Sequence, residues 1–368
     1  MRTVIAHDYL TQRGGAERVA LALGDAFPGS PFVTSVYEPD LSFPEFRDRE
    51  IVTGPLQHWP GVRRDPRKAL PLLAPAWDRT AVTHADVVVA STSGWAHGVG
   101  VPDGCALVAY CHNPARWLYQ TEDYLPRAWQ RAVTRPLRRR LEAWDRRAAQ
   151  RVDTYVANSS SVAARIERVY GRPSTIVHPP VSIDVDGPQE PVEGLQPGFF
   201  LTVGRGRGYK NVRAVIDGVG LLGDAQVAVV GSAPRGEQAD AHARWLGVVS
   251  DAQLRWLYAN ARALVAVSYE DFGLTPIEAN AFGTPVAVLR AGGYLDSTHE
   301  GVSGVFIDAP LADAVAETLR GMPELATEAV VRHAARFSQA RFAQQMHEVV
   351  AGVVGDSDSG QRLAAEAA

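Results

Sequence analysis

The segment Glu270-Asp-Phe-Gly-Leu-Thr-Pro-Ile-Glu278 follows an apolar run, Ala263-Leu-Val-Ala-Val-Ser268, and leads into a helical segment from Pro276 to Phe282. This order predicts a buried strand, a tight acidic turn and a helix start within about twenty residues. In open α/β sheets, ligands bind in the crevice beyond the carboxyl ends of the strands. A helix that starts there offers free backbone N–H groups and the positive end of its dipole, which favour a phosphate group.

Strands and helices alternate on both sides of this segment, which predicts parallel sheets covered by helices. The chain has 368 residues, too many for one ordinary core, so we expect two doubly wound α/β domains. The predicted strands are Thr3–His7, Phe32–Tyr37, Asp86–Ala90, Cys105–Tyr110, Val152–Ala157 and Ser174–Val177, then Phe199–Val203, Gln226–Val230, Ala243–Val249, Ala263–Val267, Pro285–Leu289 and Gly304–Ile307.

A segment rich in Pro, Asp, Glu and Gly, residues 181–198, has little periodicity and is typical of a linker. It separates an expected first domain, residues 1–180, from a second domain, residues 199–337. We expect residues 338–354 to form the final helix. The tail 355–368 is small and polar, which predicts disorder.

The composition, 46% hydrophobic and 21% charged, is that of a soluble globular protein. A net charge of -4 argues against a general nucleic-acid binder. The two cysteines, Cys105 and Cys111, have no CxxC partner, so we expect neither a disulfide framework nor a zinc site. The chain opens on a short strand and contains no apolar run long enough to span a bilayer, which favours a cytoplasmic protein.

Glycine-rich loops follow several predicted strands. In Gly204-Arg-Gly-Arg-Gly-Tyr-Lys210, the flexible backbone would let Arg205 and Lys210 converge on one anion. A diphosphate fits such a pair, and a basic surface loop is the alternative. Gly14 and Gly15 follow the first strand, where backbone comes close to a phosphate or sugar, or forms a plain βα turn.

The two carboxylates of the opening segment have different local contexts. Thr275-Pro-Ile-Glu278 reads as a capping box with Pro276 at the first helical position, which gives Glu278 a structural role. Glu270 has no such role, and its position suits hydrogen bonds from the hydroxyls of a sugar. A hydrolytic acid–base pair is the alternative, because sequence spacing does not give the separation of the carboxyl groups.

One histidine and two basic segments also stand out. The strand ending at Tyr110 delivers His112 to the edge of the sheet, where it is a candidate ligand contact or a capped loop residue. The segments Arg63–Lys68 and Arg127–Arg151 are basic in an otherwise acidic chain. They predict solvated faces or, alternatively, a peripheral patch that faces a phosphate-bearing acceptor or anionic lipid at the inner face of the plasma membrane.

Glu270 through Glu278 resembles the E-x7-E motif of the retaining nucleotide-sugar transferases of glycosyltransferase family 4. Val203-Gly-Arg with Lys210-Asn211 resembles their diphosphate loop, and Gly14-Gly-Ala-Glu17 resembles their first-strand loop. The resemblance runs from His7 to about Met346. It implies the GT-B architecture, two Rossmann-like parallel-sheet domains facing across a cleft, with a last helix that crosses back to the first domain.

The resemblance also implies roles for single residues. Arg205 and Lys210 would hold the donor diphosphate, Glu278 would bind the ribose, and His112 and Glu270 would contact the transferred sugar. His112, Arg205, Lys210 and Glu270 are thus the expected catalytic residues. No cofactor and no metal ion is expected, because the nucleotide-sugar is a substrate. The expected donor-binding residues are Gly14, Gly15, Gly204, Arg205, Lys210, Gly231, Glu270, Phe272, Gly273, Leu274, Thr275 and Glu278.

Tyr110-Cys-His-Asn-Pro-Ala-Arg-Trp117 resembles a segment of bacterial mannosyltransferases of surface-polysaccharide assembly, which usually use GDP-mannose. The implied enzyme moves mannose, with retention, from GDP-mannose to a glycan or lipid-linked acceptor. Asn113 and Asp296 depart from the family pattern, so a UDP- or ADP-sugar donor stays open. The same architecture and motifs also fit a nucleotide-sugar epimerase, or a non-catalytic scaffold subunit that binds sugar nucleotides.

Overall fold

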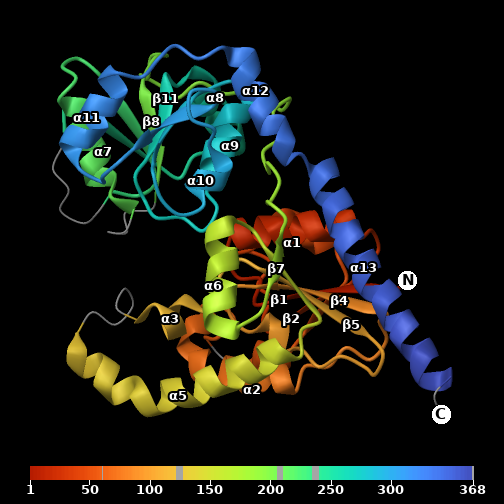
Figure 1. Cartoon of the computed structure of the whole chain (residues 1–368). Helices are drawn as coiled ribbons and strands as arrows, with labels where there is room; N and C mark the ends of the chain where they lie inside the picture. The colour runs from red at the N-terminus through yellow and green to blue at the C-terminus, as the bar shows by residue number, and fades with distance from the viewer. Residues whose placement is uncertain (60, 122–126, 205–209, 234–239, 367–368) are drawn as a thin grey trace. The chain divides into compact units, whose positions relative to one another are not determined.

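The computed structural model describes residues 1–59, 61–121, 127–204, 210–233 and 240–366 (Figure 1). The chain divides into two compact units, Met1–Pro179 with Gln339–Ala368, and Pro180–Ser338. Each unit is built around its own parallel sheet with helices on both faces. The prediction of two parallel-sheet α/β domains is therefore confirmed.

The sheet of the first unit has the strand order β3-β2-β1-β4-β5-β6-β7, and every neighbouring pair is parallel. From β1 the chain moves outward to β3 and then returns to β4 on the other side of β1. This reversal creates a topological switch point between β1 and β4, the place where ligands bind in such sheets. The strands are β1 (Thr3–His7), β2 (Phe32–Thr34), β3 (Ile51–Thr53), β4 (Val87–Thr92), β5 (Ala106–Cys111), β6 (Thr154–Ala157) and β7 (Ser174–Ile176).

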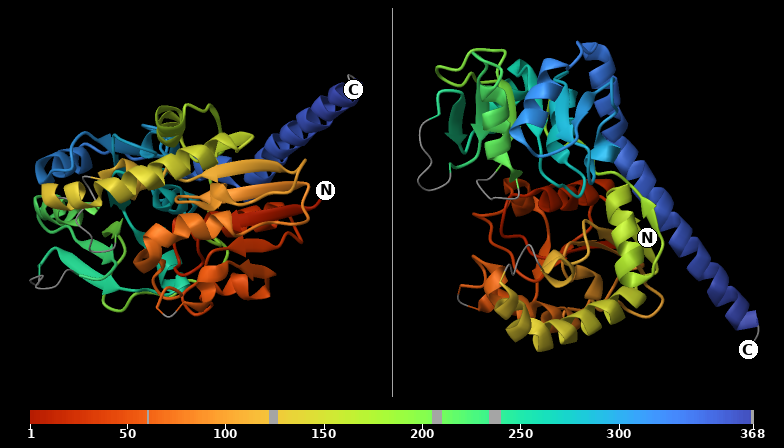
Figure 2. Two further views of the ribbon diagram at one scale, coloured as in Figure 1. Left: turned by 90° about the horizontal axis from the view of Figure 1, so that it is seen from below. Right: turned by 60° about the vertical axis from the view of Figure 1, so that its left-hand side comes forward.

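Helices cover both faces of this sheet, so β4 and β5 are buried along their whole length. One face packs against α1 (Gly15–Ala26) and α13 (Gln339–Glu366), which lie side by side. The other face packs against α2 (Leu70–Asp78), α5 (Ala128–Gln150) and α6 (Ser160–Tyr170) (Figure 2). The short helices are η1 (Pro44–Asp48), η2 (Pro55–His58), η3 (Pro66–Ala69), η4 (Ala96–Gly98) and α3 (Arg116–Tyr119).

The sheet of the second unit has the order β10-β9-β8-β11-β12-β13, again all parallel. Its switch point lies between β8 and β11. The strands are β8 (Phe200–Val203), β9 (Val227–Val230), β10 (Ala243–Gly247), β11 (Ala263–Ala266), β12 (Val286–Leu289) and β13 (Gly304–Ile307). The helices are α7 (Val212–Gly220), α8 (Asp251–Asn260), α9 (Leu274–Ala281), α10 (Tyr294–Ser297), α11 (Ala312–Arg320), α12 (Thr327–Ala334) and η6 (Ala335–Phe337).

Residues 181–198, which we expected to be a linker, contain no helix or strand but pack against the second unit. Leu195 is buried, and Ile183 and Val192 contact the same apolar cluster. Arg255 donates hydrogen bonds to the backbone oxygens of Asp184 and Pro188. A few apolar side chains in a Pro- and Gly-rich segment are enough to hold it on the domain surface.

Three further details differ from the sequence prediction. Strand β3, Ile51–Thr53, was not predicted, because only three residues of it are extended and all are at least partly exposed. Strand β2 ends at Thr34 rather than at Tyr37. Helix α13 continues past residue 354 to Glu366, where Gln, Arg, Leu and Ala are good helix formers despite the polar composition. In the described part of the chain, no helix is long and apolar enough to cross a membrane.

Candidate functional site

At the switch point of the second sheet, Lys210 follows β8 and Glu270 follows β11. The Lys210 Nζ lies 2.6 Å from Glu270 Oε1, and each side chain is about one-fifth exposed, at 22% and 20%. Ser268 Oγ donates to the same carboxylate oxygen at 2.8 Å. The structure thus brings together two predicted site residues that are far apart in sequence. Arg205, the second predicted cation, lies outside the described residues.

The position of Lys210 is fixed by its neighbour Asn211. Asn211 has a left-handed backbone, with φ 49°, at the start of α7. Its side-chain amide donates to the backbone oxygen of Val267 at 3.0 Å, which ties this loop to the end of β11. Gly204 N donates to Val230 O, and a Cβ on Gly204 would lie 3.0 Å from Val212. The predicted site residue Gly204 therefore allows Val212, the first residue of α7, to pack closely beside the end of β8.

The acidic turn packs tightly against the loop before α10. Gly293 N donates to Glu270 O at 2.9 Å, and a Cβ on Gly293 would lie 2.2 Å from Asp271 O. A Cβ on Gly292 would lie 2.4 Å from Glu270 O. Tyr294 OH lies 3.0 Å from Ser268 Oγ. Sequence reasoning missed these supporting residues, although the Gly-Gly pair after β12 was a usable signal for a close backbone approach.

The predicted capping box is wrong. Helix α9 begins at Leu274 after Gly273, whose φ of 89° turns the chain into the helix without a side-chain cap. Thr275 and Pro276 therefore lie inside the first turn, where a proline is tolerated because its missing N–H would have no intrahelical partner. A Cβ on Gly273 would lie 2.4 Å from the Tyr294 ring, so space also favours glycine.

Glu278 has a different structural role from the one predicted. Its Oε1 accepts a hydrogen bond from Ser182 Oγ at 2.8 Å, and its Oε2 accepts one from Tyr258 OH at 2.9 Å. Burial, reinforced by Glu278, holds the pKa of Tyr258 well above its usual value, so the phenol stays a donor. A carboxylate oxygen has two acceptor positions, so the oriented Glu278 can accept further hydrogen bonds.

Two predicted donor contacts have surroundings that limit their role. Phe272 is buried against Ile277 and Phe337, so a donor molecule could meet its backbone but not its ring. Gly231 directly follows β9 and has φ 135°, and its N–H donates to Gly247 O at 2.8 Å. It lies one strand away from the Lys210 loop on the side of the sheet away from β11.

At the switch point of the first sheet, polar side chains gather in the interior. His7 Nδ1 lies 3.0 Å from Ser91 Oγ, which lies 2.8 Å from His112 Nε2. Burial, followed by the neighbouring His7, lowers the pKa of His112 to about 3, so its ring is neutral at ordinary pH. Asp8 accepts hydrogen bonds from the backbone N–H groups of Ser93, Trp95 and Ala96, which fixes the loop after β4.

Gly14 and Gly15 lie at the start of α1, beside this cluster. A Cβ on Gly14 would lie 2.6 Å from Glu17 Oε2, so Gly14 leaves room for a buried carboxylate. Glu17 is only 2% exposed and receives a hydrogen bond from Gln12 at 2.9 Å. Sequence reasoning interpreted this motif as a backbone approach to a ligand or as a plain βα turn, and assigned no role to Glu17.

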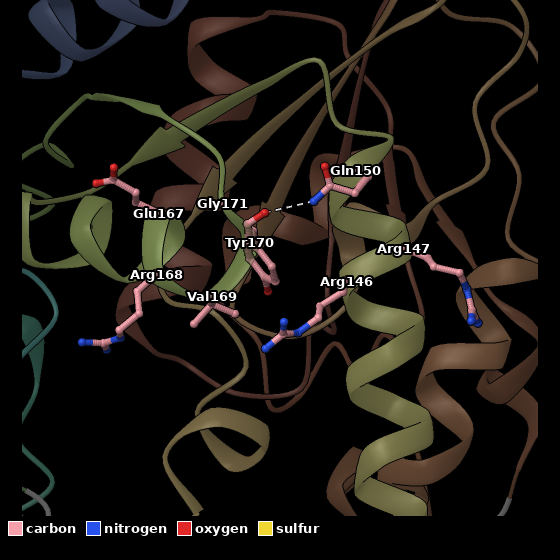
Figure 3. Close-up of a pocket in the computed structure, with 8 residues that line it drawn as sticks. All are labelled: Arg146, Arg147, Gln150, Glu167, Arg168, Val169, Tyr170 and Gly171. Carbon is pink, nitrogen blue, oxygen red and sulfur yellow. Dashed lines mark hydrogen bonds between the residues drawn. The ribbon is translucent and has the colours of Figure 1, made fainter.

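Both basic segments lie in the first unit. Arg63 pairs with Glu38, and Arg138 pairs with Glu142 one helical turn later. A pocket of about 480 Å³ lies between α5 and α6, at the C-terminal end of α6 (Figure 3). It is lined by Arg146, Arg147, Gln150, Glu167, Arg168, Val169, Tyr170 and Gly171.

Among the described residues, no cluster of His, Cys, Asp and Glu could hold a metal ion.

Two family models match the chain. Residues 13–185 match "Glycosyltransferase Family 4", and residues 188–339 match "Glycosyl transferases group 1". The structure resembles Anabaena Alr3699/HepE in complex with UDP-glucose, with a TM-score of 0.69, 17% identity, and coverage of 96% of this chain and 100% of that chain. At this identity the likeness concerns the fold alone.

Curated relatives match over part of their length. A D-inositol 3-phosphate glycosyltransferase of Thermobispora bispora is 38% identical over 100 residues, 26% of this chain and 23% of the relative. D-inositol 3-phosphate glycosyltransferase 2 of Catenulispora acidiphila is 33% identical over 246 residues, 55% of this chain and 57% of the relative. The chain thus spans less than two thirds of either relative. The chain carries a family 4-like glycosyltransferase domain followed by a group 1 glycosyltransferase domain, each a parallel-sheet unit, and has the GT-B fold.

Proposed function

We propose that the protein is a retaining glycosyltransferase that moves a hexose from a nucleoside diphosphate sugar to a hydroxyl group of a glycan or lipid-linked acceptor. The observation that carries this proposal is the Lys210–Glu270 contact, at 2.6 Å, at the switch point of the second sheet. It joins a cation suited to a diphosphate with a carboxylate suited to sugar hydroxyls.

Lys210, with Arg205, would stabilise the negative charge that grows on the departing diphosphate. The first turn of α9 adds the positive end of a helix dipole beside the acidic turn. Glu278, oriented by Ser182 and Tyr258, is suited to accept hydrogen bonds from the ribose. His112, a neutral ring at the first switch point, would contact the transferred sugar.

For the donor we propose GDP-mannose, supported by the Tyr110–Trp117 segment. A UDP-sugar is the second candidate, because the solved structure of Alr3699/HepE contains UDP-glucose. A thermal-shift panel of GDP-mannose, UDP-glucose and ADP-glucose distinguishes them, because a ligand that binds only the folded protein raises its melting temperature. If GDP-mannose raises the melting temperature most, the proposed donor is supported. If UDP-glucose raises it more, a UDP-sugar is the donor instead.

The reaction class needs a separate experiment. The protein is incubated with its preferred donor, alone and with candidate acceptors, and the products are followed by NMR. Acceptor-dependent release of nucleoside diphosphate, with the anomeric configuration of the donor kept in the product, is expected. Conversion of the donor alone into another nucleotide-sugar would identify an epimerase instead. Binding without any turnover, across a broad acceptor panel, would favour a scaffold subunit.

A further inference from the structure

The first unit contains a continuous row of buried polar side chains that ends at His112. Glu17 Oε1 lies 3.9 Å from His7 Nε2, His7 Nδ1 lies 3.0 Å from Ser91 Oγ, and Ser91 Oγ lies 2.8 Å from His112 Nε2. The four residues are 2%, 2%, 0% and 7% exposed in that order. Little water can therefore replace a missing partner, so each hydrogen-bond donor along this row has to face an acceptor.

The Ser91 hydroxyl has a single proton and lies between two imidazole nitrogens. The hydroxyl can donate to at most one of these nitrogens, so at least one of them must donate to Ser91 Oγ. In the first arrangement, His112 donates through Nε2–H and His7 accepts at Nδ1. In the second, His7 donates through Nδ1–H and His112 accepts at Nε2.

Glu17 distinguishes these two arrangements through its effect on the far side of the His7 ring. The first arrangement puts a proton on His7 Nε2, facing the carboxylate, whereas the second puts a lone pair there. The carboxylate is held in place, because Gln12 donates to Oε1 and Gly14 leaves space for Oε2. In an interior of low dielectric constant, a lone pair facing a carboxylate is unfavourable, so Glu17 favours the first arrangement.

We propose that Glu17, His7 and Ser91 are positioning residues that hold His112 in its Nε2–H tautomer and leave Nδ1 as a hydrogen-bond acceptor for a hydroxyl group of the transferred sugar. Among the described residues, Nδ1 of His112 has no hydrogen-bond partner, in contrast to Nε2. The neutral state of the ring follows from its lowered pKa. The role toward the sugar rests on the proposed function, but the tautomer does not.

The tautomer is measured on the donor-free full-length protein by long-range ¹H–¹⁵N NMR of the histidine rings. The spectrum of a His112→Gln variant identifies the His112 signals by their loss. We expect a protonated Nε2 and an unprotonated Nδ1 in the native protein. In Glu17→Gln, which keeps the shape but removes the charge, the Nδ1–H form should gain population. A native His112 protonated at Nδ1, or a tautomer balance that is the same in Glu17→Gln, overturns the proposal.

Kinetics test the consequence for the sugar. Ser91→Ala removes the connecting hydroxyl, and we expect kcat/KM for the donor to fall about 5- to 10-fold, the size of one neutral hydrogen bond. Ser42→Ala is the matched control, because Ser42 is equally buried in the same unit but donates only to the backbone of Leu10 and Glu38. Equal losses in both variants would contradict a positioning role. An inactive native protein with the expected tautomer would refute the proposed function but leave the assignment of the His112 tautomer intact.

Discussion

The two glutamates of the acidic turn are held in different ways, although both were recognised from one sequence motif. Glu270 is paired with a lysine from another strand end, whereas Glu278 is fixed by a serine and a tyrosine. Ser182 is 96 positions away from Glu278 and lies in a segment whose composition is typical of a linker. The sequence indicated both carboxylates and also Lys210, but the Ser182 and Tyr258 partners of Glu278 lie in segments that carry no such signal.

Tyr258→Phe should weaken donor binding, because Glu278 loses one of the two donors that orient it. We expect KM for the donor to rise about fivefold with little change in kcat, the effect of one hydrogen bond of about 1 kcal/mol. Tyr37→Phe is the control, because the Tyr37 hydroxyl is buried without a hydrogen-bond partner among the described residues. Initial-rate kinetics of both variants check this, and an unchanged donor KM in Tyr258→Phe would refute the assigned role of Glu278.

His112 should make the stability of the protein depend on pH. Its folded-state pKa of about 3 lies below the ordinary value of 6.5, so its contribution is complete above pH 6.5 and is lost as the pH falls toward 3. Between pH 6.5 and pH 5 the free energy of unfolding falls by about 2 kcal/mol, because His112 binds a proton in the unfolded chain but stays neutral in the folded protein. Denaturant unfolding of His112→Gln should show a shallower pH dependence by about this amount. If the free energy of unfolding depended on pH equally in the variant and the native protein, this contribution of His112 would be excluded.

The elements that the sequence predicted best are the buried strands. Their short apolar runs of valine, leucine and alanine are typical of parallel strands that are covered by helices on both faces, and the strands are buried as this pattern predicts. Helix α9 was misplaced by two residues, because Gly273 starts it through its backbone rather than through a capping side chain. Element boundaries depend on such single backbone conformations, which composition does not reveal.

Gly293→Ala tests how the acidic turn is supported. The added methyl group would lie 2.2 Å from both Asp271 O and Phe272 Cα, so backbone must move. We expect destabilisation by about 2 kcal/mol or more and a loss of donor binding. Gly321→Ala is the control, since the nearest atom to its Cβ would be 3.6 Å away. Thermal unfolding and donor titration of both variants check this, and a Gly293→Ala protein with native donor affinity would contradict the packing argument.

In the whole molecule, each unit presents its candidate residues at the switch point of its own sheet. The alternation of strands and helices predicted both sheets, but strand order, and with it the switch points, follows from the tertiary structure. Residues 339–366 form a helix that packs on α1 through Phe342, Met346 and Val350, and it belongs to the first unit although it follows the second in sequence.

Metal chelation tests where the charge on the leaving diphosphate is neutralised. In the proposed mechanism, Lys210 and Arg205 supply the positive charge. We therefore expect the turnover rate in excess EDTA to stay within about twofold of the untreated rate, since the protein's own cations provide the electrostatic stabilisation. Loss of activity that is restored by Mg²⁺ or Mn²⁺ would assign that role to a metal ion.

The most direct test of the central claim is a calorimetric titration of the preferred nucleotide-sugar into three proteins: the native chain, Lys210→Ala and Lys68→Ala. Lys68 is the only other lysine of the chain and is exposed, so its variant controls for the loss of a lysine charge. We expect Lys68→Ala to bind like the native chain, and Lys210→Ala to bind about 10- to 100-fold more weakly, the range for a lost charge-assisted hydrogen bond to phosphate. Equal donor affinity in Lys210→Ala and the native chain would contradict the assignment of the donor diphosphate to this switch point.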